Sequence, residues 1–386
     1  MASGVFFYTD DFLEYNFGQD HPLQPIRIKR TCELLSCYGV FSSIPREIPA
    51  KCTKAELLMA HSQEFIEITD RLSIGEHVPS HRRYGFGSQD NPIFPGMYEA
   101  SLTYCGASLD AARAILDGCD RAVNLSGGLH HAHFDRAAGF CTFNDCVLAI
   151  KLLRQKYDRV AYVDIDVHHG DGVQEAFYDD PSVLTISIHQ TGRTLFPGTG
   201  YPDEAGSGYG RGYAVNMPLW PATNGAAWLN VWREIGWKRL KAFLPEVIVL
   251  QMGTDAHFSD PLADLNVTAV EWIEAVRDVL ELGTPVVALG GGGYNSTVVP
   301  RLWTLAMDSL FDLHLPDEIP SSFPCRELGE SLSDAFHPDA HDHYAERALS
   351  SAGETISSCK KVFGDMLLLN TEKYAVPNKQ GDMNDR

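Results

Sequence analysis

The side chains best suited to chemistry stand together at 164–171, where the chain reads Asp-Ile-Asp-Val-His-His-Gly-Asp. They follow the apolar run 160–163, which is typical of a buried strand. Charges are costly there unless a metal ion or an ion pair compensates them. Because side chains alternate along a strand, residues 164, 166 and 168 are expected on one side. We therefore predict that Asp166 and His168 bind one metal ion, in preference to a simple polar exit from the strand.

A third ligand is expected from Asp255, which ends the apolar run 247–255 in the same way. The alternative is a helix N-cap, a common position for aspartate. Two carboxylates and one imidazole would leave open positions for water and substrate, as in catalytic sites. Zinc and ferrous iron both suit this mixture of nitrogen and oxygen donors, so the ligand types leave the metal open.

Two adjacent histidines, His130 and His131, follow a strand candidate and a Gly-Gly turn that can direct both inward. Two aspartates of the first cluster, Asp164 and Asp171, have no ligand role. The economical assignment is two His–Asp dyads, in which each carboxylate orients one imidazole and raises its basicity. Such a pair would transfer protons beside a metal-bound water.

Four consecutive glycines at 290–293 precede Tyr294. The run lacks the Lys-Ser/Thr of a phosphate-binding loop and the spacing of a dinucleotide motif, so nucleotide binding is disfavoured. The glycines instead allow the backbone to place Tyr294 deep in a pocket, where its phenol can donate to a polarised carbonyl oxygen. The glycine-rich run 206–212 is interpreted as a loop before a strand.

Short apolar strands alternate with amphipathic helical patterns along the chain. Strands are expected at 4–8, 121–125, 160–166, 183–189, 247–252 and 285–289. Helices are expected at 25–38, 96–116, 144–156, 226–243, 268–280 and 298–313. This alternation indicates an α/β fold with a largely parallel sheet covered on both faces. Ligands bind at the carboxyl ends of such strands, where all the polar clusters lie, so one domain with one site is predicted.

One domain is expected over residues 1–375, with 376–386 as a disordered tail. A peripheral helix is predicted around 343–363, and the cluster of His337, His341 and His343 is interpreted as its surface start. The formal net charge of -20, without a basic block, argues against binding to nucleic acid or to acidic membranes. The absence of a leader-like or bilayer-length apolar segment favours a cytoplasmic protein.

Several motifs together resemble the histone deacetylase family, and within it the bacterial acetoin-utilisation type close to class I. They are LHHA at 129–132, GFC with ND at 139–145, DIDVHHGDG at 164–172, FPGTG at 196–200, QMGTD at 251–255 and GGGGY at 290–294. The resemblance runs from about residue 21 to about residue 303. It implies the arginase/deacetylase fold, with a parallel sheet of about eight strands layered between helices.

The resemblance implies a zinc-dependent enzyme, with ferrous iron as the alternative, that removes acetyl groups from lysine-like amines. The implied metal ligands are Asp166, His168 and Asp255. His131, paired with Asp171, would be the general base. His130, paired with Asp164, would act electrostatically and relay protons. Tyr294 would donate a hydrogen bond to the amide oxygen.

The same resemblance implies substrate-binding residues and two monovalent cation sites for potassium or sodium. The substrate residues are Gly139, Phe140 and Phe196 of the tunnel, Leu262 and Asp90 of the rim, and Arg27 near the acetate channel. The first cation site would use Asp164, Asp166, His168, Ser187 and Ile188. The second would use Phe177, Asp180, Val183 and Tyr213.

Acetylated protein lysines are the leading substrates, and acetylated polyamines or other small amides are the alternative. An acidic surface suits either cationic class. A catalytically inactive acetyl-lysine binder is disfavoured because no group that the chemistry requires is missing. Guanidine hydrolysis of the arginase type is disfavoured because it needs paired metals. A homo-oligomer remains open.

Overall fold

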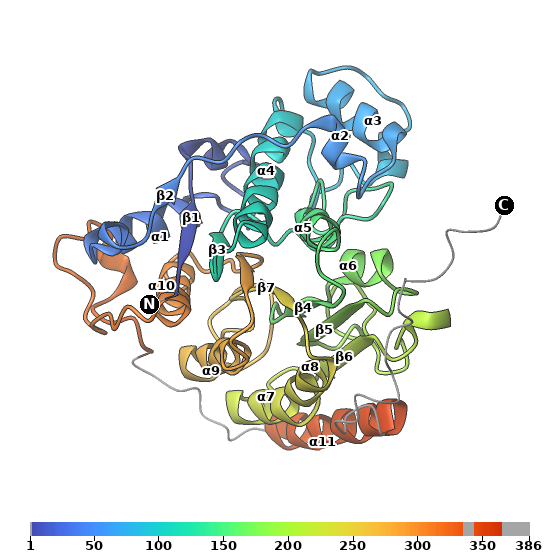
Figure 1. Ribbon diagram of the computed structural model, residues 1–386, viewed down its shortest axis with the longest axis vertical. Helices are drawn as coiled ribbons and strands as arrows, with labels where there is room; N and C mark the ends of the chain where they lie inside the picture. The colour runs from blue at the N-terminus through green and yellow to red at the C-terminus, as the bar shows by residue number, and fades with distance from the viewer. Residues whose placement is uncertain (1, 335–342, 365–386) are drawn as a thin grey trace.

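The computed structural model describes residues 2–334 and 343–364, which form a central sheet between layers of helices (Figure 1). Within these residues the sheet has eight parallel strands in the order β2-β1-β3-β8-β7-β4-β5-β6. The strands are β1 (Gly4–Phe7), β2 (Arg46–Glu47), β3 (Arg121–Asn124), β4 (Val160–Asp164), β5 (Val183–Gln190), β6 (Ala214–Leu219), β7 (Val247–Gln251) and β8 (Val286–Leu289). The predicted α/β class and parallel sheet are confirmed.

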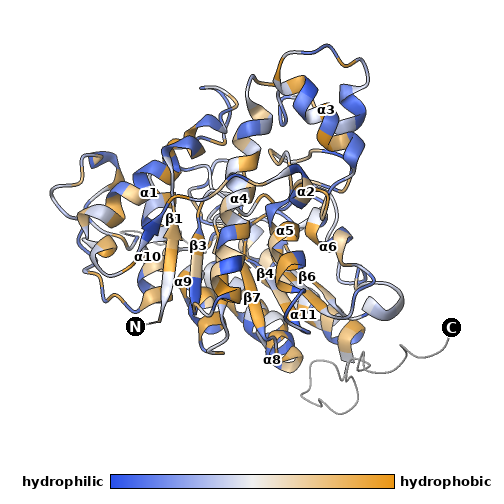
Figure 2. Ribbon diagram, turned by 45° about the horizontal axis from the view of Figure 1, so that its top comes forward, coloured by the Kyte–Doolittle hydropathy of each residue, from blue (hydrophilic) through white to orange (hydrophobic). Residues whose placement is uncertain are grey.

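The strands are apolar because helices cover both faces of the sheet, which leaves no face for water. Every residue of β4, β5 and β7 is buried, and β7 is mostly orange in the hydropathy view of Figure 2. Six strands lie near the predicted positions and β6 follows the predicted loop at 206–212. The exception is β2, whose two exposed residues carry no apolar signal.

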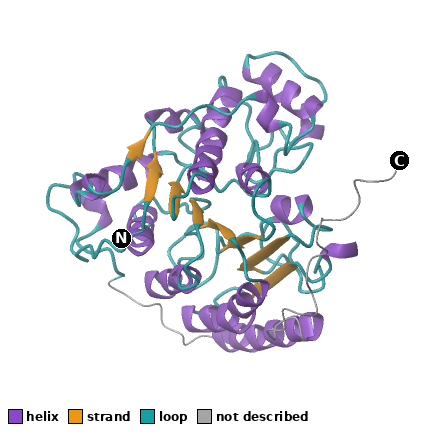
Figure 3. Ribbon diagram, viewed as in Figure 1, coloured by secondary structure: helices purple, strands orange, loops and turns teal. Residues whose placement is uncertain are grey.

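Helices lie on both sides of the sheet, with α4, α5 and α6 on one side and α7 to α10 on the other (Figures 1 and 3). The α-helices are α1 (Ile26–Cys37), α2 (Lys54–Leu57), α3 (Gln63–Ser73), α4 (Met97–Leu116), α5 (Asp145–Leu153), α6 (Asp171–Ala176), α7 (Gly225–Val231), α8 (Lys238–Phe243), α9 (Ala269–Leu280), α10 (Val299–Phe311) and α11 (His343–Phe363). The predicted continuous helix over 226–243 is wrong in one respect, because a π-helical segment, Trp232–Trp237, separates α7 from α8.

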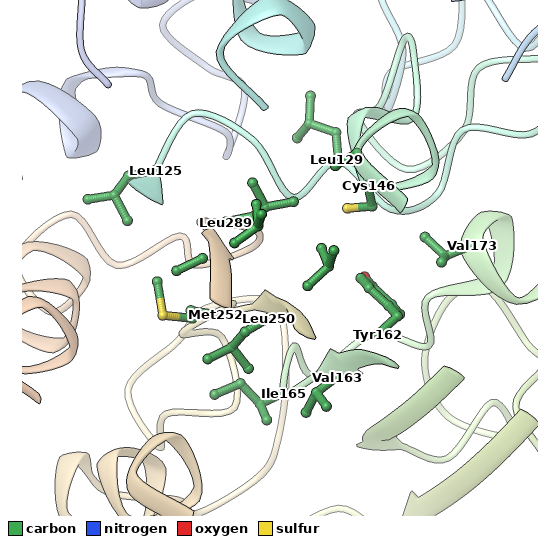
Figure 4. Packing of buried hydrophobic residues seen from close by; sticks show 14 of the residues in the cluster. Leu125, Leu129, Cys146, Tyr162, Val163, Ile165, Val173, Leu250, Met252 and Leu289 are labelled. Atoms are coloured by element: carbon green, nitrogen blue, oxygen red, sulfur yellow. The ribbon is translucent and has the colours of Figure 1, made fainter. Parts of the chain in front are cut away.

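Successive side chains of β4 point to opposite faces of the sheet and so contribute to the hydrophobic core on both sides. Tyr162 points towards Cys146 of α5, whereas its neighbour Val163 points to the other face of the sheet (Figure 4). Leu250 of β7 lies beside Val163, with which it is paired in register. The buried strands therefore form a rigid base beneath the polar residues that follow them.

The edge strand β6 is covered by α11. Thr355 donates to the carbonyl of Pro218 at 2.6 Å and Cys359 donates to that of Asn216 at 3.3 Å. These contacts satisfy acceptors that an open edge would expose. The predicted peripheral helix is confirmed, although His337, His341 and the tail at 376–386 lie outside the described residues. Across the described ranges, none of the helices has both the length and the apolar character needed to cross a bilayer.

Strand order decides which loops meet. The strands β3, β8, β7 and β4 are neighbours in the sheet although they are distant in sequence. The loops after them carry His130, Tyr294, Asp255 and Asp166, respectively. All the chemistry-bearing segments therefore leave the same edge of the sheet at adjacent positions, as expected for ligand sites of parallel α/β folds.

Candidate metal-binding active site

Three donor side chains converge at the carboxyl ends of β4 and β7. The ligand atoms of Asp166, His168 and Asp255 lie within 4.8 Å of one another, and all three residues are buried. The Nδ1 atom of His168 is 3.1 Å from Asp166 Oδ1 and 3.1 Å from Asp255 Oδ2. Burial and the neighbouring Asp166 carboxylate raise the pKa of Asp255 above its usual range. Two buried carboxylates this close require positive charge, so the donor set fits a divalent metal ion.

The route from β4 to the ligands differs from the prediction. The expectation that the strand continues through Asp166 is wrong, because β4 ends at Asp164. Asp164 Oδ1 accepts the backbone N–H of Asp166 at 3.1 Å, and Asp166 Oδ1 accepts that of His168 at 2.9 Å. Aspartate side chains that bond two residues ahead favour turns over continued strand. Asp166 and His168 therefore converge through successive turns, not through alternation along the strand.

Backbone and side-chain donors hold the ligand carboxylates in place. Asp166 Oδ2 accepts from Gln251 Nε2 at 2.8 Å and from the N–H of Gly292 at 2.7 Å. Asp255 Oδ1 accepts the N–H of Val167 at 2.8 Å. A Cβ atom on Gly292 would lie 2.0 Å from Asp255 Oδ2. The glycine-rich run after β8 thus lets the backbone approach both carboxylates. This is a second role for these glycines, in addition to the predicted one of placing Tyr294.

The first histidine dyad is fully enclosed. His130 Nδ1 is 2.7 Å from Asp164 Oδ2, which also accepts a hydrogen bond from the Tyr162 hydroxyl at 2.8 Å. Burial opposes the charge on His130, but the carboxylates of Asp164 and Asp166 outweigh it and raise its pKa to about 9. The two carboxylates therefore favour the protonated form of His130.

The second dyad lies beside the first and has the opposite electrostatics. His131 Nδ1 is 2.8 Å from Asp171 Oδ1, and its Nε2 is 3.0 Å from His130 Nε2. Burial, followed by the charge of His130, lowers the pKa of His131 to about 3. Despite burial, contact with His131 holds the pKa of Asp171 well below its usual range. A neutral imidazole oriented by a charged carboxylate can accept a proton.

Tyr294 faces the same centre from the loop after β8. Its ring centroid lies 6.3 Å from that of His168, and Asp260 Oδ2 accepts its backbone N–H at 2.7 Å. Burial and the nearby carboxylates raise the pKa of Tyr294 well above its usual range, so the phenol keeps its proton. Arg27 lies behind this loop, where its Nη1 donates to the Gly293 carbonyl at 2.9 Å. The tyrosine is thus a hydrogen-bond donor on a loop tied at two points.

Two aromatic rings flank the site. Phe196 is 43% exposed and packs edge-on against His131, with centroids 4.9 Å apart. Phe140 packs edge-on against Tyr294 at 5.6 Å and has a left-handed backbone, with φ of 68°. A Cβ atom on Gly139 would lie 2.4 Å from the His131 ring, so this position requires glycine. The two histidines, Phe140 and Tyr294 line a small pocket.

Other predicted substrate residues lie farther out. Leu262 is partly buried and donates its N–H to Asp260 Oδ1 at 2.9 Å, so Asp260 links the loops of Leu262 and Tyr294. Asp90 is exposed, and its carbonyl is 3.4 Å from His21 Nε2. The His21 ring in turn packs edge-on against Phe140.

The residues predicted to bind monovalent cations fall into two groups. In the first, Asp164 and Ser187 are register partners on β4 and β5, and the Ser187 hydroxyl is 2.8 Å from His189 Nδ1. The second lies where β5 begins. There the carbonyl of Phe177 accepts the Asp180 N–H at 3.1 Å, and the carbonyl of Asp180 accepts the Val183 N–H at 3.3 Å. Tyr213 precedes β6, and Ile188 is buried within β5.

Four supporting residues had no predicted role. Gln251 is part of the QMGTD motif. Tyr162 precedes Asp164 by two residues, so alternation along the strand could have predicted that these two side chains lie on the same face. Asp260 and His133 offered weaker signals. Asp260 resembles an ordinary turn residue, and His133 is a third histidine two residues after the pair. The partners of Asp260 and His133 are distant in sequence and become neighbours only in the folded chain.

The fold and this site together define a deacetylase-type hydrolase centre, and comparisons with known proteins agree. The histone deacetylase domain family matches residues 21–310. The chain is 41% identical over 313 residues to the acetoin utilization protein AcuC of Bacillus subtilis, covering 78% of this chain and 81% of that protein. It is 37% identical over 319 residues to histone deacetylase 1 of Homo sapiens, covering 82% of this chain and 66% of that protein.

Solved structures show the same relationship. The crystal structure of a histone deacetylase homolog from Aquifex aeolicus superposes with a TM-score of 0.81 at 30% identity, covering 91% of this chain and 99% of that one. A crystal structure of such a homolog complexed with SAHA gives the same values. The chain therefore belongs to the histone deacetylase family and has the arginase/deacetylase fold. Within that family it resembles AcuC.

Proposed function

We propose that this chain is a zinc-dependent deacetylase that hydrolyses acetyl-lysine side-chain amides of proteins or peptides. One observation carries the proposal: a mixed nitrogen and oxygen ligand set, two His–Asp dyads and a protonated tyrosine converge at one end of the sheet. Zinc held by Asp166, His168 and Asp255 would supply Lewis-acid activation of water and of the amide carbonyl. The donor types suit ferrous iron as well.

The protein side chains divide the remaining chemistry. His131, held by Asp171, accepts a proton from the attacking water and returns it to the leaving amine. His130, held by Asp164, keeps positive charge beside the reacting atoms and relays protons. Tyr294 donates a hydrogen bond to the carbonyl oxygen as negative charge develops on it.

The substrate side chain enters between the rings of Phe140 and Phe196, above Gly139. Asp90 binds the backbone around the acetylated lysine, Leu262 is an apolar residue of the rim, and Arg27 stabilises the departing acetate. The two groups that we assign to monovalent cations would bind potassium or sodium, the first beside the metal centre through Asp164, Asp166 and His168 and the second where β5 begins. A cytoplasmic location, which the sequence favours, belongs to this proposal.

Metal-reconstituted protein assayed side by side on acetyl-lysine peptides and acetylated polyamines tests the proposal. Asp166→Ala and Tyr294→Phe serve as controls that should lose most activity on the same substrate. Turnover of acetyl-lysine peptides with higher kcat/KM supports the protein-lysine substrate. A strong preference for acetylated polyamines would show that these, and not protein lysines, are the substrates. No turnover of any acyl amine would refute the proposal that the chain is a deacetylase.

A further inference from the structure

The mechanism above leaves out His133, a histidine that is buried beside the second dyad. It is 7% exposed, and its backbone is held at both ends. Its N–H donates to the carbonyl of Arg136 at 2.9 Å, and its own carbonyl is 2.9 Å from His61 Nδ1. The imidazole is therefore placed by a rigid loop.

Both ring nitrogens of His133 face carboxylates. Nε2 is 3.4 Å from Asp171 Oδ2, and Nδ1 is 2.5 Å from Glu175 Oε2. A ring that meets an anion at each nitrogen is best satisfied when both nitrogens carry protons. Burial opposes that charge, but the two carboxylates outweigh it and raise the pKa of His133 to about 9. The nearby charged and titratable groups on neighbouring elements are Lys151, Arg136 and His61.

The two oxygens of Asp171 have different partners. Oδ1 serves His131 and the N–H of Gly172, at 2.8 and 3.0 Å. Among the described residues, Asp171 forms ion pairs with two histidines, and His133 is the one that faces Oδ2. Behind His133 lies a cavity of about 150 Å³, whose lining includes Phe134, Lys151 and Glu175. Without the imidazole, water from this cavity would reach Oδ2 and the carboxylate could rotate away from His131.

We propose that His133 is a positioning residue for the deacetylation reaction: it holds Asp171 through Oδ2 so that Oδ1 stays on His131. Glu175 completes the arrangement from the outside, since its side chain is 56% exposed and bonds the far nitrogen of the same ring. The second dyad is thus the inner part of a four-membered chain, His131–Asp171–His133–Glu175. The inference rests on the proposed function, because the chain of contacts matters only if His131 transfers protons.

The test is a double-mutant cycle between His133 and Asp171, measured on an acetyl-lysine peptide with the zinc-loaded full chain. His133→Gln keeps one neutral donor and should lower kcat about tenfold, with KM within about twofold, as outer partners of catalytic groups do. In the Asp171→Asn background the same substitution should have almost no further effect, because the carboxylate it positions is gone. An equal loss in both backgrounds would show that His133 acts elsewhere and would overturn the proposal.

A second variant guards against a folding defect. Glu175→Gln alters a half-exposed outer carboxylate and should lower kcat about threefold by the same route, with a smaller loss of stability than His133→Gln. Unchanged kcat in both single variants would also overturn the proposal. Crystal structures of the unsubstituted and His133→Gln chains give a readout independent of activity: Asp171 should turn away from His131 in the variant, and an unmoved carboxylate contradicts the proposal. If the unsubstituted chain turns over no acyl amine, the proposed function fails, while these structures still decide the positioning.

Discussion

The two His–Asp dyads contain the same residue types and lie side by side, yet their surroundings shift the pKa values of the two histidines in opposite directions. The first uses Asp164, at the end of a central strand with its side chain fully buried. The second uses Asp171, the first residue of α6, whose side chain is 14% exposed. The pKa of His130 is raised to about 9, whereas that of His131 is lowered to about 3.

The difference comes from the neighbours. His130 lies near two carboxylates, Asp164 and Asp166, which favour its protonated form. His131 is buried next to that charged ring, while its own carboxylate is shared with His133. The surroundings thus favour a protonated imidazole in the first dyad and a neutral one in the second, so a shared motif does not imply shared electrostatics.

The largest expected effect is a loss of kcat that differs between substitutions of His131 and His130. His131→Ala should lower kcat by about 10³ to 10⁴, because it removes the proton acceptor. His130→Ala should lower it by about 10², since it removes fixed charge but leaves the base. Steady-state kinetics on one acetyl-lysine peptide measure both values. Equal losses, or a larger loss for His130→Ala, would contradict the division of roles.

Two glycine substitutions disturb one dyad each. A Cβ atom on Gly139 would lie 2.4 Å from the His131 ring, and one on Gly170 would lie 2.4 Å from Asp164 Oδ2. Displacing the base should cost about 10² in kcat for Gly139→Ala, because a shift of about 1 Å is that damaging. Gly170→Ala should cost about tenfold in kcat and destabilise the fold by about 1–3 kcal/mol through overpacking. The ranking is tested by kinetics and urea unfolding of both variants; a reversed order would refute it.

The hydroxyl that supports the first dyad should affect stability more than the reaction. Tyr162→Phe leaves the buried Asp164 without one donor, which should cost about 1–3 kcal/mol in the free energy of unfolding. Chemical denaturation measures this cost. Tyr209→Phe is the matched control, because Tyr209 is 88% exposed and its variant should stay within about 0.5 kcal/mol of the parent.

The smallest effect concerns pH and the second dyad. The pKa of His133 is raised to about 9 in the folded chain, above an ordinary value of about 6.5. Its ion pairs therefore contribute stability that is complete below about pH 6.5 and is lost as pH rises through about 9. The stability lost in His133→Gln should be about 1 kcal/mol at pH 6 and should vanish near pH 10.

Urea unfolding of both chains at several pH values measures this difference, with His77→Gln at an exposed histidine as the control. A deficit that is constant with pH would show that His133 contributes packing and no charge.

Local patterns were sufficient to predict every strand except β2 and to single out the three side chains that converge as candidate metal ligands. Apolar runs that end in carboxylates identify β4 and β7, because a buried strand leaves few other positions for charge. The turn after β4 was not predictable in this way, since Asp164 and Asp166 bend the chain by bonding the backbone two residues ahead. The role of Asp260 was hidden because its partner Tyr294 is 34 residues away.

The sequence by itself determined the α/β class, the residues able to bind a metal and the supply of two histidines and two aspartates. These features depend on residue type and local periodicity, which a single chain displays. Only the tertiary structure decided that β8 and β7 lie between β3 and β4, and so brought Tyr294 and Asp255 to the dyads. It also decided that the pKa shifts of His130 and His131 are opposite, because a pKa depends on burial and on neighbours that come from distant segments.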